Sequence, residues 1–245
     1  MRRHLAGERP ARYHCGMFSH GPLRIEVFND SIFAQNGMLV WLEGQPDAWI
    51  VDPGLPPQPE EMLQAIERHK LTRLAIVLTH CHADHIAGIR PLRAARADVA
   101  IVCPEAEASF LTSAEANLSA ALGFPIVAPP ADELVRPGES MALGELMWEI
   151  LDVAGHSPGG VAYHCAAVGV ALVGDALFAE SIGRYDFPHS DRVRLLRNID
   201  RNLLSLPDNT TIYPGHGPPA TIGQVKMSNW TLISELSRLD EDADE

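Results

Sequence analysis

The stretch from Thr79 to His85 constrains this chain more than any other part of its sequence. It reads Thr-His-Cys-His-Ala-Asp-His and follows an apolar run at 74–78, which predicts a buried strand. Four side chains that can bind a metal fall within six residues just after that strand: His80, His82, Asp84 and His85. Residues i and i+2 of an extended segment point to the same face, so His80 and His82 can meet one ion. Asp84 and His85 would lie where the chain turns, free to bind a second ion.

The residue types in this stretch indicate which ions it can hold. Imidazole and carboxylate ligands suit zinc, and they also suit iron or manganese. A surface cluster of histidines is the alternative, because the chain has 11 histidines among its 245 residues. Four ligand-type residues directly after an apolar strand favour the metal site, provided that distant residues complete it. Cys81 should point away from the two histidines beside it and pack in the core.

Composition disfavours several classes of function. The chain is 46% hydrophobic and 21% charged, which is typical of a globular protein. It has no apolar run of about 18 residues, the length that predicts a membrane span. A formal net charge of −13 disfavours a nucleic-acid partner, so we expect a small-molecule substrate. The first residues lack the apolar segment of a secretory signal and the cysteines form no CxxC pair, so we expect a cytoplasmic protein.

Changes of pattern along the chain predict one large domain with two short flanking segments. Residues 1–22 show no periodicity and are expected to form an irregular N-terminal extension. The domain would span residues 23–237, and the acidic residues 238–245 would form a mobile tail. The histidines of the extension should lie at the surface: His4, His14 and His20.

Hydrophobic periodicity predicts a mixture of strands and helices. Apolar or alternating runs predict strands at 25–28, 37–43, 48–51, 74–78, 99–102, 147–153, 161–165, 168–173 and 210–213. Helical spacing and start signals predict helices at 60–69, 86–96, 104–111, 114–122, 192–206 and 222–236. The strands at 161–165 and 168–173 should form a hairpin.

Three further strands end in Gly or Pro next to a residue that can bind a metal. These residues are His156, Asp175 and His216. A single His or Asp after a strand is more often a capping or turn residue. Loops at one edge of a sheet sandwich can converge, however, and all three together with the heptapeptide predict a completed site.

These motifs resemble those of the metallo-β-lactamase superfamily, whose hallmark is HxHxDH followed by separate His, Asp and His ligands. The resemblance covers roughly residues 23–237 and implies an α/β fold, namely an αβ/βα four-layer sandwich of two mixed β-sheets with helices outside. It also implies two divalent metal ions at one edge, zinc first, with iron or manganese as alternatives.

The resemblance assigns each ligand a place. His80, His82 and His156 would hold the first ion. Asp84, His85 and His216 would hold the second, and Asp175 would bridge both. A carboxylate at the bridging position argues against the antibiotic-degrading enzymes that have cysteine there. His82 and Asp84 also match the hydrolases rather than the flavodiiron proteins, in which the second His is Glu.

Three loop motifs resemble those of glyoxalase II, in particular its short single-domain relatives. They are Gly-His-Ser-Pro-Gly at 155–159, Ser-Ile-Gly-Arg-Tyr-Asp-Phe-Pro at 181–188 and Tyr-Pro-Gly-His-Gly-Pro at 213–218. Two-domain glyoxalase II enzymes bind glutathione with a basic C-terminal helical domain. Here 29 residues follow His216, and Lys226 is the only basic residue among them before Arg238, so the thiol carrier of the substrate is left open.

The resemblance implies a thioester hydrolase that acts on a small acyl thioester such as S-D-lactoylglutathione. Two cations would lower the pKa of a bridging water, and the resulting hydroxide would attack the thioester carbonyl. Asp84 would orient this nucleophile, and Asp52 would support a ligand histidine through a hydrogen bond. Arg184, Tyr185 and Asn36 are candidate substrate contacts, although Arg184 can instead form a salt bridge with Asp186.

Other functions are compatible with the same residues. A persulfide dioxygenase with a single iron shares the ligands, but Gly215-His216-Gly217 favours a hydrolase. A hydrolase of another ester, a lactone or a phosphodiester is a further alternative. A non-catalytic binding protein would be expected to have lost some ligands, and all seven are present.

Overall fold

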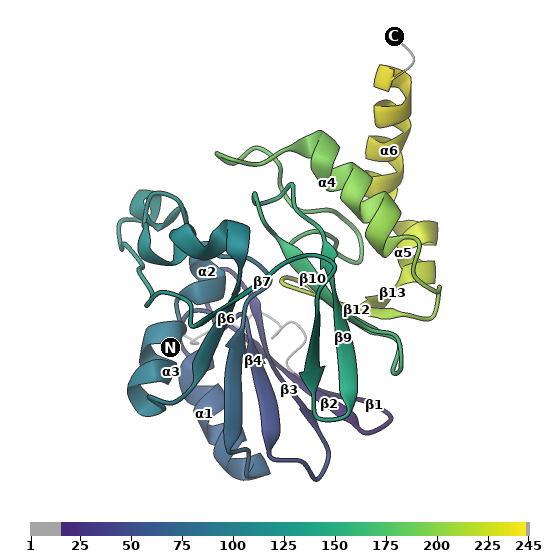
Figure 1. Cartoon of the computed structure of the whole chain (residues 1–245). Coiled ribbons are helices and arrows are strands. Elements are labelled where there is room, and N and C mark those ends of the chain that lie inside the picture. The colour runs from purple at the N-terminus through teal and green to yellow at the C-terminus, as the bar shows by residue number, and fades with distance from the viewer. Residues whose placement is uncertain (1–15, 244–245) are drawn as a thin grey trace, which may run out of the picture.

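The apolar runs of the first half of the chain form a seven-stranded sheet. The computed structural model describes residues 16–243, and this sheet has the order β1-β2-β3-β4-β5-β6-β7 (Figure 1). Its strands are β1 (Gly16–His20), β2 (Leu23–Asn29), β3 (Asn36–Leu42), β4 (Asp47–Val51), β5 (Arg73–Val77), β6 (Ala100–Pro104) and β7 (Glu133–Val135). Strands β1 to β4 pair antiparallel and β4 to β7 pair parallel, so the sheet is mixed.

The second half of the chain forms a six-stranded mixed sheet of order β13-β12-β11-β10-β9-β8. Its strands are β8 (Ser140–Leu143), β9 (Leu146–Asp152), β10 (Val161–Cys165), β11 (Val170–Gly174), β12 (Thr211–Pro214) and β13 (Ala220–Thr221). Only β11 and β12 pair parallel. The predicted hairpin of β10 and β11 is confirmed, with Tyr163 opposite Leu172.

The two sheets pack face to face through one apolar face of each. Strand β2 follows the period of two, since Leu23, Ile25 and Val27 all point into this shared core. Trp49 of the first sheet meets Trp148 of the second, with ring centroids 5.3 Å apart. Burying the aromatic and branched side chains between the sheets drives this packing.

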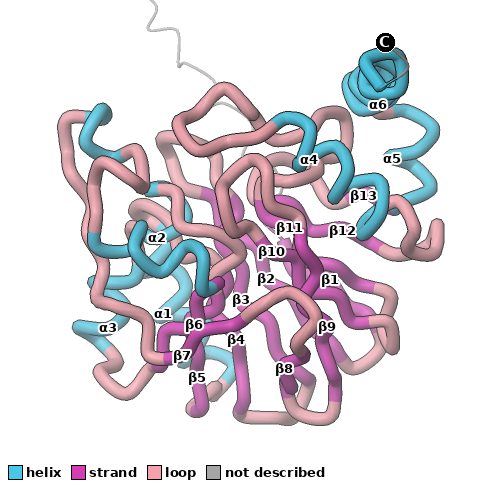
Figure 2. Tube along the Cα trace, turned by 45° about the horizontal axis from the view of Figure 1, so that its top comes forward, coloured by secondary structure: helices cyan, strands magenta, loops and turns pink. Residues whose placement is uncertain are grey.

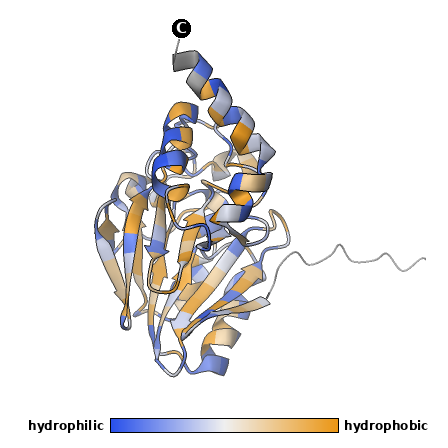
Figure 3. Ribbon diagram, turned by 90° about the vertical axis from the view of Figure 1, so that its right-hand side faces the viewer, coloured by the Kyte–Doolittle hydropathy of each residue, from blue (hydrophilic) through white to orange (hydrophobic). Residues whose placement is uncertain are grey.

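Helices cover the outer face of each sheet, as Figure 2 shows. On the first sheet, α1 (Gln58–His69) and α3 (Ile89–Ala95) bury their apolar residues against the strands. On the second sheet, α4 (Arg192–Asn198), α5 (Ile222–Ser228) and α6 (Trp230–Ala243) do the same. In Figure 3 hydrophobic residues dominate the strands, whereas α6 carries hydrophobic and hydrophilic residues in alternation. The predicted α/β four-layer sandwich is therefore confirmed.

Several predicted helices are shorter than expected or divided. The prediction at 86–96 becomes α2 (Ala83–Ile86) and α3, and that at 104–111 becomes a 3-10 helix, Glu105–Thr112. The prediction at 192–206 becomes α4 and a π-helical segment, Ile199–Leu203, and that at 222–236 becomes α5 and α6, divided at Asn229.

The prediction of a helix at 114–122 is wrong, because only Ser119–Leu122 is helical and it is of the 3-10 type. The Asn117 Oδ1 atom accepts hydrogen bonds from the Ser119 amide at 3.1 Å and from its hydroxyl at 2.6 Å. These local bonds give the backbone an alternative to the α-helix, which alanine content alone does not reveal.

Both flanking segments depart from the sequence-based expectation. Gly16–His20, expected within the irregular extension, is the edge strand β1 and pairs with β2. Phe18 on β1 packs against Tyr213, with ring centroids 5.4 Å apart, which explains why this short segment is ordered as a strand. At the other end α6 extends to Ala243, past the start of the expected tail at 238. His4 and His14 lie outside the described residues, and no helix between 16 and 243 is long and apolar enough to cross a membrane.

Candidate metal centre

The seven predicted ligands lie at one edge of the sandwich, five in loops that follow strands of the two sheets and two, Asp84 and His85, in the short helix α2 (Ala83–Ile86). His80 and His82 follow β5, and His156 follows β9. Asp175 comes directly after β11, and His216 follows β12. Because these strands end at the same edge, segments far apart in the sequence bring their side chains together there.

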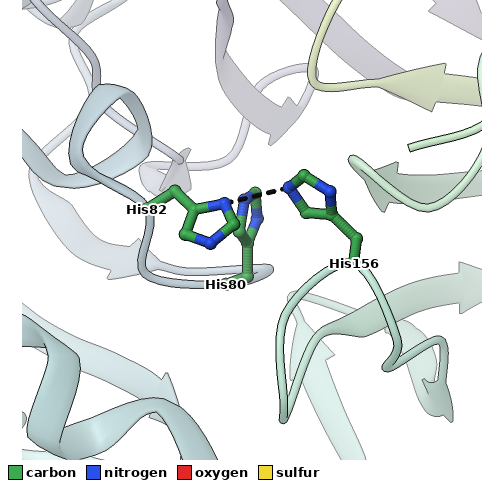
Figure 4. A group of neighbouring side chains, drawn as sticks. All are labelled: His80, His82 and His156. Atoms are coloured by element: carbon green, nitrogen blue, oxygen red, sulfur yellow. Dashed lines mark hydrogen bonds between the residues drawn. The ribbon is translucent and has the colours of Figure 1, made fainter. Parts of the chain in front are cut away.

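The first group of ligand-type residues consists of three buried histidines, His80, His82 and His156. Each offers one ring nitrogen such that these atoms lie within 4.8 Å of one another. Figure 4 shows the imidazoles facing a common point, with the His82 Nδ1 and His156 Nε2 atoms 2.9 Å apart. As predicted, both histidines come just after the strand: β5 ends at Val77, and they lie in the loop before α2. The loop turns both rings to one place.

The second group consists of Asp84, His85 and His216, whose ligand atoms also lie within 4.8 Å of one another. The short helix α2 carries Asp84 and His85. The Nε2 atom of His216 lies 3.3 Å from Asp84 Oδ2, and that of His85 lies 3.8 Å from the same oxygen. A single turn of helix therefore aims two neighbouring residues at one point.

The Asp175 carboxylate lies between the two groups. Its Oδ1 atom is 3.4 Å from His85 Nε2, and its Oδ2 atom is 3.4 Å from His216 Nε2. Oδ2 is also 3.6 Å from His156 Nε2, in the first group. The loop after β12 comes close to the Asp175 carboxylate, and this approach requires a glycine at position 215. A Cβ on Gly215 would lie 2.1 Å from Asp175 Oδ1 and 2.6 Å from His85 Cε1. This is the physical reason for the glycine before His216.

Buried polar atoms without partners indicate that cations fit this centre. His80 Nε2 is buried and has no hydrogen-bond partner, and the buried His85 Nε2 and Asp175 Oδ1 atoms face each other at 3.4 Å without a hydrogen bond. Leaving such atoms unpaired costs free energy, and native proteins seldom do so without a reason. All three belong to the ligand set, and imidazole with carboxylate is a donor set that divalent transition metals prefer. The residues present therefore fit two cations that share Asp175.

Burial keeps the first group in the form that binds a cation. Burial lowers the pKa of His80 well below its ordinary value, and His85 lowers it further. Burial and the nearby His156 lower the pKa of His82 to about 3, and burial also lowers the pKa of His156. These rings are neutral at pH 7, so a cation need not displace protons from them.

Carboxylates have the opposite effect on the second group. Burial lowers the pKa of His216, but Asp175 and Asp84 outweigh burial and raise it to about 10. The same two carboxylates outweigh burial at His85 and raise its pKa. These rings are charged partners of the carboxylates when no cation is present, so a cation must displace their protons.

Asp52, directly after β4, contacts two of the loops and helices that carry candidate ligands. Its carboxylate accepts hydrogen bonds from the Thr79 amide at 2.8 Å and from the Thr79 hydroxyl at 2.6 Å. Its Oδ2 atom also lies 3.0 Å from His85 Nδ1, and Thr79 Oγ1 lies 3.1 Å from His80 Nδ1. Asp52 therefore orients one ring directly and another through Thr79, leaving Nε2 of each for a cation.

Glu107 is a supporting residue that sequence reasoning missed. It is fully buried, and its carboxylate accepts the Cys81 amide at 3.2 Å and the Gly159 amide at 2.7 Å. One carboxylate thus connects the loop of His80 and His82 with the loop of His156. No local pattern marks it, because Glu107 lies in a 3-10 helix distant in sequence from both loops.

The two ligand groups open into a cavity of about 420 Å³. Of the three predicted substrate contacts, only Arg184 lines it. Asn36 is buried and its side-chain amide donates to the Pro214 and Gly217 carbonyl oxygens, so it supports the loop that carries His216. Tyr185 is exposed and lies outside the cavity. Asn36 and Tyr185 do not line this cavity, and their roles as substrate contacts stay predictions.

Comparison with known proteins agrees with this architecture. The profile of the "Metallo-beta-lactamase superfamily" matches residues 32–216, a span that contains all seven candidate ligands. The chain belongs to the metallo-beta-lactamase superfamily. It is 34% identical to "Hydroxyacylglutathione hydrolase GloC" of Haemophilus influenzae, over 87% of this chain and 100% of that protein. It is 36% identical to "Probable metallo-hydrolase YqgX" of Bacillus subtilis, over 71% of this chain and 81% of that protein.

Solved structures resemble the chain over most of its length. One is the crystal structure of BLEG-1 B3 metallo-beta-lactamase, with a TM-score of 0.79 and 33% identity over 84% of this chain and 98% of that chain. Another is TTHA1623 in a di-iron-bound form, with a TM-score of 0.72 and 32% identity over 83% of this chain and 98% of that chain. The fold and superfamily inferred from the motifs are confirmed.

Proposed function

We propose that this protein is a binuclear metal-dependent hydrolase of small acyl thioesters, with S-D-lactoylglutathione as the first substrate to test. The observation that carries the proposal is the position of Asp175, 3.4–3.6 Å from histidines of both ligand groups at the base of the cavity. Similarity to a hydroxyacylglutathione hydrolase supports the thioester chemistry.

The ligand assignment follows the two groups. We assign His80, His82 and His156 to one cation and Asp84, His85 and His216 to the other, with Asp175 shared. Zinc is the first choice of ion, and iron or manganese would suit the same ligands. The free thiols of Cys81, Cys103 and Cys165 support a reducing compartment such as the cytoplasm.

The protein residues have defined tasks in the reaction. Two bound cations supply a water molecule of lowered pKa and polarise a carbonyl group. The Asp84 carboxylate lines the cavity and can accept a hydrogen bond from the attacking water, which aims its oxygen at the thioester carbonyl carbon. The carbon–sulfur bond then breaks, and the thiolate is a good leaving group that needs no strong general acid. The aromatic side chains of Phe33, Phe178 and Phe187 line the cavity around this point and limit the access of bulk water to the reacting groups.

A panel of thioesters tests the proposal. Metal-free protein would be loaded with zinc, iron or manganese, its metal content measured, and S-D-lactoylglutathione, acyl-CoA and simple thioesters supplied. We expect about two ions per chain and thioester hydrolysis, which Asp175→Asn should abolish. His69→Gln, a change on α1 away from the centre, is the matched control. Hydrolysis of no thioester, together with turnover of a lactone or a phosphodiester, would overturn the proposal. Oxygen consumption by the iron form with glutathione persulfide would indicate a dioxygenase instead.

A further inference from the structure

The walls of the cavity above the metal centre are apolar. They come from three separate parts of the chain. These are the loop before β3, the 3-10 helix Ser119–Leu122 with the residue that precedes it, and the loop after β11. The apolar side chains that line the cavity are Phe33, Leu118, Leu122, Phe178 and Phe187. A concave apolar surface of this kind favours an apolar part of a ligand by the hydrophobic effect.

The cavity offers little to a charged ligand beyond the metal centre. Apart from the candidate ligands, Arg184 is the one charged side chain among the described residues that line it. Its guanidinium donates to both carboxylate oxygens of Asp186, at 2.9 and 2.8 Å, and lies 4.2 Å from the centroid of the Phe187 ring. Glutathione carries two carboxylates, and coenzyme A carries phosphates. The cavity walls therefore do not match the charges of the common thiol carriers.

The other polar residue of the wall is fully engaged. The Asn117 amide donates to the carbonyl oxygens of Phe110 and Ile126, at 3.1 and 2.9 Å, and its side-chain oxygen accepts from Ser119. Its backbone carbonyl accepts a hydrogen bond from the amide of Ala83 at 3.0 Å. Ala83 is the residue between His82 and Asp84 in the sequence. Asn117 thus serves as an anchor between the cavity wall and the ligand loop.

This anchor holds Leu118 in a backbone conformation that leucine seldom adopts. The φ angle of Leu118 is +70°, in the left-handed region. Glycine and asparagine occupy this region at lower cost, so sequence preference alone would not put a leucine there. The Leu118 side chain nevertheless lines the cavity. A strained residue held over a candidate site is a reason to ask what its side chain does there.

Taking the proposed thioester hydrolysis as given, we propose that the acyl group of the substrate is apolar and that Leu118 is a specificity-determining residue that contacts it. Biological thiol carriers are polar or charged, so the apolar walls suit the acyl end and the carrier extends toward solvent. The cavity of about 420 Å³ falls in the size range of small-molecule sites. An acyl chain of several carbons, or an aromatic acyl group, would use these walls, whereas an acetyl or lactoyl group would leave them uncovered.

The test compares acyl groups on one uncharged carrier. Acetyl, hexanoyl and phenylacetyl thioesters of N-acetylcysteamine, and S-D-lactoylglutathione, would be supplied to the metal-loaded wild type and to Leu118→Asn. Asparagine tolerates the left-handed conformation, so this variant should fold, and its thermal unfolding midpoint checks that it does. Met227→Gln, at an exposed apolar residue on α5, is the matched control.

We expect the wild type to prefer hexanoyl over acetyl in kcat/KM. Leu118→Asn should lower kcat/KM for hexanoyl about tenfold, because losing part of an apolar contact is worth roughly that much in discrimination. The acetyl value should change by less than about twofold, since the acetyl group does not reach the wall. Met227→Gln should leave both values unchanged.

A binding measurement gives a readout that does not depend on turnover. The thioether S-hexyl-N-acetylcysteamine cannot be hydrolysed, so its affinity for metal-free protein can be measured by calorimetry. It should bind more tightly than the S-methyl analogue, with a negative heat-capacity change, and Leu118→Asn should remove the difference.

Three outcomes would overturn the inference. Equal loss of acetyl and hexanoyl activity in Leu118→Asn would mean a structural role for Leu118. Faster turnover of S-D-lactoylglutathione than of any apolar thioester would refute an apolar acyl group while leaving thioester hydrolysis intact. Hydrolysis of no thioester by the metal-loaded wild type would overturn the proposed function and this inference with it.

Discussion

At the scale of single residues, Glu107 connects the two loops that carry His80, His82 and His156. Its carboxylate accepts two backbone amides, one from Cys81 and one from Gly159. A charged acceptor between two loops holds both more firmly than a neutral one, because such hydrogen bonds are shorter and stronger. The spacing between the three imidazoles therefore depends on a residue that is not a ligand.

Glu107→Gln should weaken the first metal site. The amide oxygen can replace one acceptor, but the amide nitrogen would face the other backbone N–H. Changes to residues that support metal ligands typically cost 10- to 100-fold in metal affinity, so we expect a loss of about that size. Competition with a coloured chelator measures it. Glu105→Gln, in the same 3-10 helix but at the surface, is the control, and equal affinities in the two variants would contradict this role.

Gly215→Ala tests the close packing around Asp175. The added Cβ would lie 2.1 Å from Asp175 Oδ1, and Asp175 cannot easily move away because histidines of both groups surround its carboxylate. We expect metal content to fall below one ion per chain, measured by atomic emission, together with activity. Gly16→Ala on β1 meets only ordinary contacts and should retain full metal content. Normal metal content in Gly215→Ala would show that the loop can move aside.

At the scale of elements, the break between α5 and α6 serves the cavity as well as the fold. Asn229 lies at this break, and its Oδ1 atom accepts the Leu232 amide at 3.0 Å in the first turn of α6. Its side-chain amide donates to the carbonyl oxygens of Phe178 and Ser181, at 3.1 and 2.9 Å. The start of α6 is thereby attached to the loop that carries a wall of the cavity.

The packing of α6 on α4 includes an ion pair whose contribution should depend on pH. Arg192 Nε donates to Glu235 Oε2 at 2.6 Å, and Arg238 donates to Oε1 at 2.9 Å. Arg192 lowers the pKa of Glu235 below its ordinary value, against the effect of burial. A carboxyl group with a lowered pKa stabilises the fold above its unfolded pKa of about 4.3, and this contribution is lost as the pH falls through the folded pKa.

Glu235→Gln should therefore lower the free energy of unfolding at pH 7 by about 1 kcal/mol, as expected for a partly screened ion pair with several hydrogen bonds. The difference from the wild type should shrink as the pH falls below about 4, when the wild-type carboxyl group becomes protonated. Thermal unfolding between pH 3 and pH 7 would measure it, with the exposed Glu180→Gln as control. A difference that persists unchanged at low pH would assign the effect to packing rather than to charge.

At the scale of the whole molecule, the candidate metal centre brings together residues from the two halves of the chain. Ligands from loops after β5 and in α2 belong to the first half, and His156, Asp175 and His216 belong to the second. Without a cation, the buried Nε2 atom of His80 has no hydrogen-bond partner. Cation binding therefore favours the state in which both halves are folded and in contact.

Removing the metal should lower the stability of the entire domain. We expect chelation to lower the thermal unfolding midpoint by more than 5 °C and to restore it when zinc is added, because ligands that bind only the native state stabilise it by mass action. Differential scanning calorimetry would measure the shift. The variant His80→Asn, which lacks one ligand, should respond less to added zinc. An unchanged midpoint after complete chelation would argue against a resident metal.

Much of the fold and of the ligand set could be predicted from the sequence. Period-two and continuous apolar runs such as 74–78 locate strands because side-chain alternation is a local property of the backbone. The ligands are recognisable because imidazole and carboxylate groups cluster after those strands. Local hydrogen bonding at Asn117 and tertiary packing of Phe18 on Tyr213 decided the segments where prediction failed.

By itself the sequence determined the types of ligand, their order, and the presence of a strand before each of them, since these depend on residue chemistry and local periodicity. Only the tertiary structure decided that Asp175 lies between both groups, that Glu107 connects two loops, and that Asn36 and Tyr185 do not line the cavity. Such positions depend on how strands from two sheets end at one edge. Residues separated by fifty or more positions meet there, and no local pattern records the distance between them.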